Sequence, residues 1–167
     1  MSVATDRGAR VTIDCTKSAL IKAIEAKPFA IKPNLSELEE SFGIKCNTYD
    51  QIVDAAIGIN KKGVENVLVS LGHDGAICVC KGDEWRVYAD KIPVYSTVGA
   101  GDAFLSGFIY AFDKGLDIRS CLKHALSFSQ VRVATKPNEE LTLQRLCEFA
   151  NTARCELIME NTGDGLR

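Results

Sequence analysis

The sequence predicts an α/β fold in which helices cover a largely parallel sheet, and two observations carry this prediction. Short apolar runs typical of strands alternate along the chain with segments whose apolar residues recur at helical spacing. One run, residues 66–71, is apolar almost throughout, as is typical of a parallel strand covered on both faces. The 167 residues are 46% hydrophobic and 25% charged, which favours one globular domain.

The first half of the chain predicts short strands and three helices. Asn34 is placed to cap one helix and Gly43 to end it, and Thr48 and Gln51 form a capping-box pattern that opens the next. The expected elements are a strand at 10–14, helix 17–26, strand 29–31, helix 35–42, helix 48–62 and strand 66–71. The residues expected to face inward are Ala19, Leu20, Ala23 and Ile24 in the first helix, and Ile52, Ala55, Ala56 and Ile59 in the third.

The second half predicts a hairpin followed by helices. Residues 72–75 turn the chain into an alternating strand at 76–81, and Gly82-Asp83 turns it into a strand at 84–89. An apolar helix follows residue 102, Asp117 opens a helix from 119 to 134, and Thr142 opens a last one to 153. The tail at 161–167 has two glycines and few apolar residues, so we expect it to be frayed.

Residues 97–102, Thr-Val-Gly-Ala-Gly-Asp, are the most informative stretch for function. The glycines allow a tight turn, and the free N–H groups of the helix that follows form an anion site with the helix dipole. Asp102 is placed where a carboxylate would take a proton from an attacking hydroxyl. The stretch therefore favours phosphoryl transfer.

This stretch is also open to simpler interpretations. A lone Gly-x-Gly before a helix is common, and Asp102 could be an ordinary first-turn acid. No Gly-Lys-Ser/Thr follows, so it is not a Walker loop. Phe104 stands where the dinucleotide fingerprint has its third glycine. Three motifs are nevertheless expected at strand exits, where α/β sheets bind ligands: residues 32–34, residues 72–75 and the loop that follows Val94.

Two further segments, in matching order and spacing, resemble the ribokinase-like sugar kinases of the PfkB family. Residues 31–38, Ile-Lys-Pro-Asn-Leu-Ser-Glu-Leu, resemble the family's Lys-Pro-Asn-x-x-Glu-Leu segment. Residues 69–76 resemble its nucleotide-side strand and turn, and residues 96–108 its second signature, a Gly-Ala-Gly-Asp loop that runs into a helix. The chain is most similar to the phosphosugar branch, which includes 1-phosphofructokinase, tagatose-6-phosphate kinase and 6-phosphofructokinase.

The resemblance implies an ATP-dependent sugar or sugar-phosphate kinase that uses Mg²⁺, and it implies a role for individual residues. Asp102 matches the catalytic base, and Asn34 and Glu37 match a pair that organises Mg²⁺ through waters. The backbone N–H groups that match the anion hole are those of Gly99, Ala100 and Gly101. The positions that match nucleotide contacts are Lys32, Asn34, Ser70, Gly72, Gly75, Thr97, Ser127 and Gln130.

Local sequence leaves other roles open for several of these residues. Asn34 and Glu37 could act only as a helix-capping pair, and Lys32 could be a solvated surface lysine. Ser127 and Gln130, one helical turn apart, could line an adenine site or simply form an exposed polar face.

The resemblance covers only the second half of such a kinase. The sugar-binding Gly-Gly segment and the β-sheet lid are not found, so we expect residues 1–160 to be the C-terminal nucleotide-binding part of a ribokinase-like layered sandwich, followed by a tail at 161–167. A truncated reading frame, an engineered piece or a proteolytic remnant would each give this pattern and would have little turnover alone. An uncovered strand at 10–14 predicts self-association or a partner chain. The alternatives are a non-catalytic nucleotide-binding or partner module and a fragment of a nucleoside kinase.

Composition bounds the remaining possibilities. The net charge of −2 gives no reason to expect nucleic acid or an anionic membrane as partner. No apolar run has the length of a membrane span and the N-terminus lacks a signal-peptide core, so we expect a cytoplasmic protein. The seven cysteines are interpreted as small buried hydrophobes, on the patterns around Cys78, Cys80, Cys121 and Cys147. Zinc is not expected, because no Cys-x-x-Cys pair exists and His73 and His124 have no matching spacing.

Overall fold

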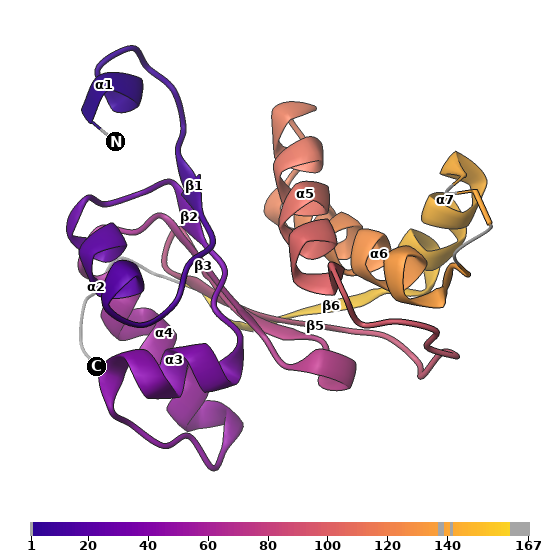
Figure 1. The fold of residues 1–167 in the computed structure, drawn as a ribbon, viewed down its shortest axis with the longest axis horizontal. Coiled ribbons are helices and arrows are strands. Elements are labelled where there is room, and N and C mark those ends of the chain that lie inside the picture. Colours follow the sequence, from indigo (N-terminus) through magenta and orange to yellow (C-terminus); the bar gives the residue numbers. More distant parts are fainter. Residues whose placement is uncertain (1, 137–138, 141, 161–167) are drawn as a thin grey trace. The chain divides into compact units, whose positions relative to one another are not determined.

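The computed structural model describes residues 2–136, 139–140 and 142–160, and the chain divides into two compact units (Figure 1). Within the described residues, unit 1 holds residues 2–72, 76–86 and 157–160. Unit 2 holds residues 73–75 and the described part of 87–156. The expected tail at 161–167 lies outside the described residues.

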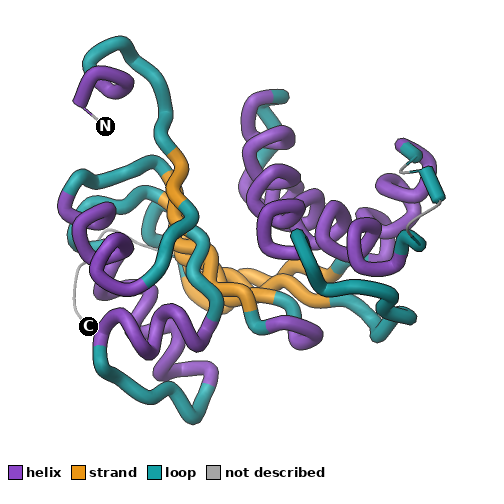
Figure 2. The backbone as a smooth tube through the Cα atoms, viewed as in Figure 1, coloured by secondary structure: helices purple, strands orange, loops and turns teal. Residues whose placement is uncertain are grey.

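The strands of the described chain, orange in Figure 2, form one mixed sheet, and their order in it is β1-β2-β3-β4-β5-β6. β1 (Thr12–Ile13) pairs parallel to β2 (Ala30–Ile31), β2 pairs parallel to β3 (Asn66–Ser70), and β3 pairs antiparallel to β4 (Ala76–Cys80). Ile31 lies opposite Ile13 on one side and Val67 on the other. β5 (Asp83–Tyr88) and β6 (Arg154–Met159) complete the order. The predicted α/β class with a mostly parallel sheet is confirmed.

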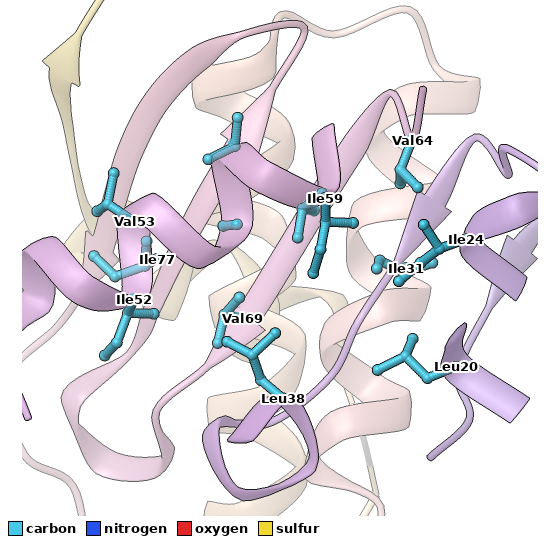
Figure 3. Close-up of a cluster of buried hydrophobic side chains, with 13 residues drawn as sticks. Leu20, Ile24, Ile31, Leu38, Ile52, Val53, Ile59, Val64, Val69 and Ile77 are labelled. Atoms are coloured by element: carbon cyan, nitrogen blue, oxygen red, sulfur yellow. The ribbon is translucent and has the colours of Figure 1, made fainter. Parts of the chain in front are cut away.

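Unit 1 is built from helices that bury one face against strands β1–β4. After the short α1 (Ser2–Thr5) come α2 (Lys17–Glu25), α3 (Leu35–Phe42) and α4 (Tyr49–Asn60), and α4 packs on β3 and β4. Their apolar side chains meet those of the strands in one buried cluster (Figure 3). Full burial of each such side chain contributes about 1.5–3 kcal/mol. The cluster includes Leu20, Ile24, Ile31, Leu38, Ile52, Ile59, Val64, Val69 and Ile77.

The predicted helix ends in unit 1 are confirmed, because capping depends on residues next to each other in the sequence. Asn34 and Glu37 form a capping box at the start of α3, and Thr48 and Gln51 form one at the start of α4. Gly43 ends α3 in the left-handed conformation, with φ 64°.

Unit 2 contains α5 (Ala100–Asp113), α6 (Ile118–Ala134) and α7 (Leu143–Thr152). The predicted N-caps are confirmed, because Asp117 accepts the N–H of Ser120 and Thr142 accepts that of Arg145. α5 and α6 approach closely at Gly107, where an added Cβ would lie 2.6 Å from the carbonyl oxygen of His124. A substituted residue 107 would therefore force the two helices apart.

Several expected elements are corrected. Strands β1 and β2 are shorter than expected, and the hairpin turn is formed by Lys81-Gly82, both with positive φ, so that β5 begins at Asp83. β4 shows no alternation, because this inner strand is buried along its whole length. Ala19 is exposed rather than inward, since only Leu20, Ala23 and Ile24 of α2 reach the core.

The C-terminal region brings further corrections. Val94 is exposed in an irregular segment rather than at the end of a strand, so the loop before α5 is not a strand exit. β6, which follows α7, was not expected. Cys147 is exposed because α7 has no buried residue, whereas Cys78, Cys80, Cys121 and Cys155 are buried and no cysteine forms a disulfide. Among the described helices, none is both long and apolar enough to cross a membrane.

Candidate active site

The start of α5 leaves backbone donors free. Gly99 takes φ 76° as the residue before the helix, and no side chain caps this end. The Ala100 N–H donates to the Thr97 carbonyl oxygen at 3.1 Å, which closes the turn. Within the described chain, the N–H groups of Gly99, Gly101 and Asp102 have no acceptor. Three amides without an acceptor thus lie at the positive end of a helix dipole, and such donors are what an anion site requires.

This geometry corrects one detail of the expected anion hole. Gly99, Ala100 and Gly101 were each expected to donate, but the Ala100 N–H is engaged in the turn and Asp102 supplies the third free amide. The positive φ belongs to Gly99, while Gly101 lies in the first turn of α5.

The Asp102 carboxylate is exposed and forms no ion pair among the described residues. Its backbone carbonyl accepts the hydroxyl of Ser106 at 2.7 Å, one turn along α5. A carboxylate that is neither buried nor paired remains free to accept a proton from a bound hydroxyl.

α6 supports this loop from within unit 2. The Val133 carbonyl accepts the N–H of Tyr95 at 2.8 Å and that of Ser96 at 3.4 Å, and the Ser96 hydroxyl accepts the N–H of Val98 at 3.3 Å. The Arg132 Nε lies 3.4 Å from the position that a Cβ on Gly99 would take. Arg132 is not among the predicted site residues, because no local motif in the sequence connects it to the loop.

Ser127 and Gln130 are buried, so the exposed-face interpretation of this pair is wrong. The Ser127 hydroxyl donates to the Leu146 carbonyl of α7 at 2.6 Å, which gives it a structural partner. The Gln130 Oε1 is buried and has no hydrogen-bond partner in the described structure. An unpartnered buried acceptor is costly, so this oxygen is the more informative of the two.

In unit 1, polar residues gather where β1, β2 and β3 end. Lys32 follows β2 and is only 5% exposed, and its Nζ lies 3.2 Å from the Asp14 Oδ2 just after β1. Lys32 is therefore not a solvated surface lysine. Asn34 and Ser70 form a parallel bridge, and the Ser70 N–H donates to the Pro33 carbonyl at 3.1 Å.

The capping interpretation of Asn34 and Glu37 is confirmed. The Glu37 N–H donates to the Asn34 Oδ1 at 2.9 Å, and the Asn34 N–H donates to the Glu37 Oε2 at 2.8 Å. Burial raises the pKa of the neighbouring Cys15 thiol, and the negative charges of Asp14 and Glu37 raise it further. Two carboxylates therefore act on the same small region of unit 1.

A Mg²⁺ ion would find few direct ligands here. No group of three or more His, Cys, Asp or Glu side chains in the described chain is arranged to hold a metal ion. Glu37 keeps Oε1 outside the capping box, and the Asn34 Oδ1 keeps a second lone pair. This donor set fits an ion that keeps most of its water ligands and is otherwise bound by phosphate groups. Mg²⁺ is usually bound in this way.

The turn at Gly72–Asp74 is a short 3₁₀ helix followed by Gly75. Gly75 has φ 88°, and a Cβ there would lie 2.0 Å from the Val87 carbonyl oxygen, so packing alone requires glycine. Gly72, with φ 63°, has open space around its Cβ position. Thr97, the last predicted contact, is exposed, and its carbonyl closes the turn before α5.

The predicted residues thus fall into two sets. Within unit 1, Lys32, Asn34, Glu37 and Ser70 lie together at the ends of neighbouring strands. Within unit 2, Thr97 and residues 99–102 form one turn beside Arg132. A glycine turn that opens a helix with free amides, in an α/β chain, is the architecture of proteins that handle phosphate groups.

Comparison with known proteins identifies the family. Residues 2–142 match the model of the family described as pfkB family carbohydrate kinase. The 1-phosphofructokinase of Borreliella burgdorferi is 33% identical over 155 residues, which are 91% of this chain and 48% of the relative. That of Escherichia coli K12 is 35% identical over 116 residues, which are 70% of this chain and 36% of the relative. The chain belongs to the pfkB family of carbohydrate kinases.

The solved structures agree on the fold. Phosphofructokinase-2 from Escherichia coli in complex with potassium matches with a TM-score of 0.82 at 22% identity, over 90% of this chain and 49% of that one. The chain spans 48% of the length of the Borreliella relative and 36% of the Escherichia coli one.

Proposed function

We propose that this chain carries the nucleotide half of an ATP-dependent sugar-phosphate kinase with a phosphofructokinase-like reaction. The observation that carries the proposal is the start of α5, where three free backbone N–H groups adjoin an exposed carboxylate. The family supports phosphoryl transfer to a carbohydrate, and the 1-phosphofructokinase names of the relatives support a phosphorylated ketose as acceptor.

In the proposed reaction, the terminal phosphate of ATP lies at the amides of Gly99, Gly101 and Asp102. The sugar hydroxyl oxygen attacks the γ-phosphorus, and the bond from phosphorus to the β,γ-bridging oxygen breaks to release ADP. The hydroxyl proton passes to the Asp102 carboxylate. The free amides and the dipole of α5 stabilise the charge on the transferred phosphoryl oxygens.

The remaining nucleotide contacts belong to the same proposal. The Asp14 carboxylate holds the buried Lys32 ammonium in place. We propose that this fixed positive charge binds a phosphate group of the nucleotide. Ser70 and Gly72 within unit 1, and separately Gly75 and Thr97 within unit 2, are the further nucleotide contacts that we propose. The Gln130 Oε1, which has no hydrogen-bond partner, would accept a hydrogen bond from the amino group of adenine. Ser127, one helical turn away on α6, would line the same site.

Asn34 and Glu37 would hold Mg²⁺ through water molecules while keeping their capping box. When bound, the ion would neutralise negative charge on the nucleotide phosphates. The protein's own contribution is to fix the orientation of these two side chains at the start of α3.

A second candidate function is a nucleotide-binding or partner module without turnover. This function is favoured by β1, which is an edge strand of the sheet and whose two residues are only half-buried. An edge strand of this kind pairs readily with another chain, so we propose self-association or a partner. One solved structure that matches the fold is described as the tetrameric inhibited form of Escherichia coli phosphofructokinase-2.

The cysteines bear on where the protein acts. All seven are free, and four of them are buried. Free thiols persist in reducing compartments, which supports a cytoplasmic location.

One experiment separates the two candidate functions. The chain is incubated with ATP, MgCl₂ and fructose 1-phosphate, and ADP and the phosphorylated sugar are quantified. ATP binding is measured by calorimetry, and association by sedimentation, in parallel. ADP formed only in the presence of the sugar phosphate supports the kinase. ATP binding without turnover fits either a nucleotide half or a nucleotide-binding module, whereas association without ATP binding supports a partner module. If the chain shows no ATP binding, no association and no turnover, both candidate functions are contradicted.

A further inference from the structure

Arg132 is a cation whose position the fold does not explain. Its Nε lies 3.4 Å, and its Nη2 4.0 Å, from the position that a Cβ on Gly99 would take, so the guanidinium lies beside the turn that opens α5. The side chain is half-buried and forms no ion pair with a carboxylate in the described part of the chain. A partly desolvated guanidinium normally has an anionic partner.

The position of Arg132 at the end of α6 explains why the residue is basic but not why its guanidinium lies beside Gly99. Arg132 belongs to the last turn of α6, where the helix dipole favours a cation. Its guanidinium nevertheless lies beside Gly99, the residue that precedes α5, at the positive end of another dipole. Positive charge next to free N–H donors is unfavourable until an anion occupies the space.

The surrounding contacts fix Arg132 relative to the loop. Its neighbour Val133 accepts the N–H groups of Tyr95 and Ser96, which join the end of α6 to the segment before Gly99. α5 and α6 also touch at Gly107, and the rings of Tyr110 and Phe128 lie 5.8 Å apart. The guanidinium and the three free amides are therefore held together within unit 2.

We propose that Arg132 binds the phosphate group held at the start of α5 and stabilises its charge during transfer. The proposal rests on the proposed function and adds a residue to it. Arginine suits this place because its planar donors bind two phosphate oxygens at once, whereas lysine offers a point charge. A Cβ at position 99 would meet the guanidinium at an ordinary contact distance, so glycine is required there by its φ of 76° rather than by Arg132.

The test observes Arg132 directly in the unmodified chain. Nuclear magnetic resonance follows the Arg132 Nε–Hε signal and the backbone amides of 99–102 during titration with ADP, ATP with magnesium, fructose 1-phosphate and inorganic phosphate. A phosphate bound as proposed shifts both sets of signals with the same apparent affinity. Separate nucleotide and sugar-phosphate titrations identify which phosphate the guanidinium meets.

Variants add a second measurement by calorimetry. Arg132→Gln should weaken binding of the responsible ligand by about tenfold to hundredfold, and Arg132→Lys should recover only part of this, as expected for loss of charge-assisted hydrogen bonds. Arg154→Gln is the control, because Arg154 lies on β6 and its exposed side chain pairs with Asp90 at 3.5 Å. It should leave affinity unchanged.

Two outcomes would overturn the proposal and are distinguishable. If the amides of 99–102 shift while the Arg132 signal stays still and Arg132→Gln binds normally, Arg132 has no role and the proposed function stands. If neither set of signals responds to any of the four ligands, the phosphate site itself is absent and both proposals fail.

Discussion

Helices α3 and α5 each begin at a motif that the sequence marks as functional, yet their first turns are built in opposite ways. At α3, the Asn34 Oδ1 accepts the Glu37 N–H and the Glu37 Oε2 accepts the Asn34 N–H, at 2.9 and 2.8 Å. At α5, Gly99 supplies no side chain, and the N–H groups of Gly99, Gly101 and Asp102 remain without acceptors in the described chain. One helix start is closed by the protein, and the other is open to a ligand.

The difference shows that a helix start can serve the fold or a ligand, but seldom both with the same atoms. A capping side chain typically contributes about 0.5–2 kcal/mol, which α5 forgoes. Such a loss is tolerated where the free donors have a use, and an anion at the helix dipole returns a comparable stabilisation. The contrast predicts that substitutions at α5 affect phosphate chemistry, while substitutions at α3 affect folding first.

The largest effect is expected for Asp102→Asn. In a preparation shown to transfer phosphate, turnover should fall by about 10²–10⁴-fold, because an amide cannot accept the hydroxyl proton. Affinity for ATP should change little. Steady-state kinetics with a separate calorimetric measurement of ATP binding tests this, and Asp113→Asn at the far end of α5 is the control. Equal losses of turnover and ATP binding would instead assign Asp102 to the structure of the loop.

Gly101→Val tests the open amides themselves. The branched side chain would crowd the free N–H groups, and ATP affinity should fall by about a hundredfold, corresponding to two charge-assisted hydrogen bonds. The helix should remain folded by circular dichroism. Gly58→Val in α4 is the control, because nothing lies within 4 Å of the Cβ position of Gly58. Unchanged ATP binding by Gly101→Val would show that α5 binds no phosphate.

Asn34→Ala sharpens the comparison from the closed side. Loss of the capping box should lower the free energy of unfolding by about 1 kcal/mol, measured by chemical denaturation. Thr48→Ala removes the equivalent box of α4 and should cost a similar amount. Only Asn34→Ala should also alter the magnesium dependence of ATP binding. Identical behaviour of the two variants in both measurements would show that Asn34 acts only as a helix cap and takes no part in binding magnesium.

The sequence revealed features that depend on neighbouring residues and missed those that depend on distant ones. Both capping boxes, the Gly43 stop and the Asp117 cap were predicted because each lies within a few residues. The α/β class followed from the alternation of apolar patterns.

Residues that owe their environment to tertiary packing could not be placed from the sequence. Ser127 and Gln130 are buried because α6 packs against both α5 and α7, whereas helical periodicity gives only one inward face. Lys32 is buried because Asp14, on a different strand end, pairs with it. Arg132 meets Gly99 only through the packing of α6 beside the loop. β6 was missed although four of its six residues are apolar, and all but Cys155 are exposed.

The smallest effect concerns the other end of α3 and depends on pH. The Glu39 carboxylate accepts the Cys46 N–H at 2.9 Å and binds the Lys45 Nζ at 2.8 Å, and these hydrogen bonds hold the pKa of Glu39 below its usual value. Because the pKa is lower in the folded than in the unfolded chain, the stabilisation is present above the ordinary pKa of about 4.3 and is lost as the pH falls through the folded-state value. Glu39→Gln should therefore melt slightly below the parent chain at pH 7. The two melting temperatures should converge under more acidic conditions. Glu40→Gln, whose contact with Lys17 is long and exposed, is the control. A difference between parent and Glu39→Gln that persists at acid pH would mean that the amide disturbs the packing of α3 rather than removing a charge.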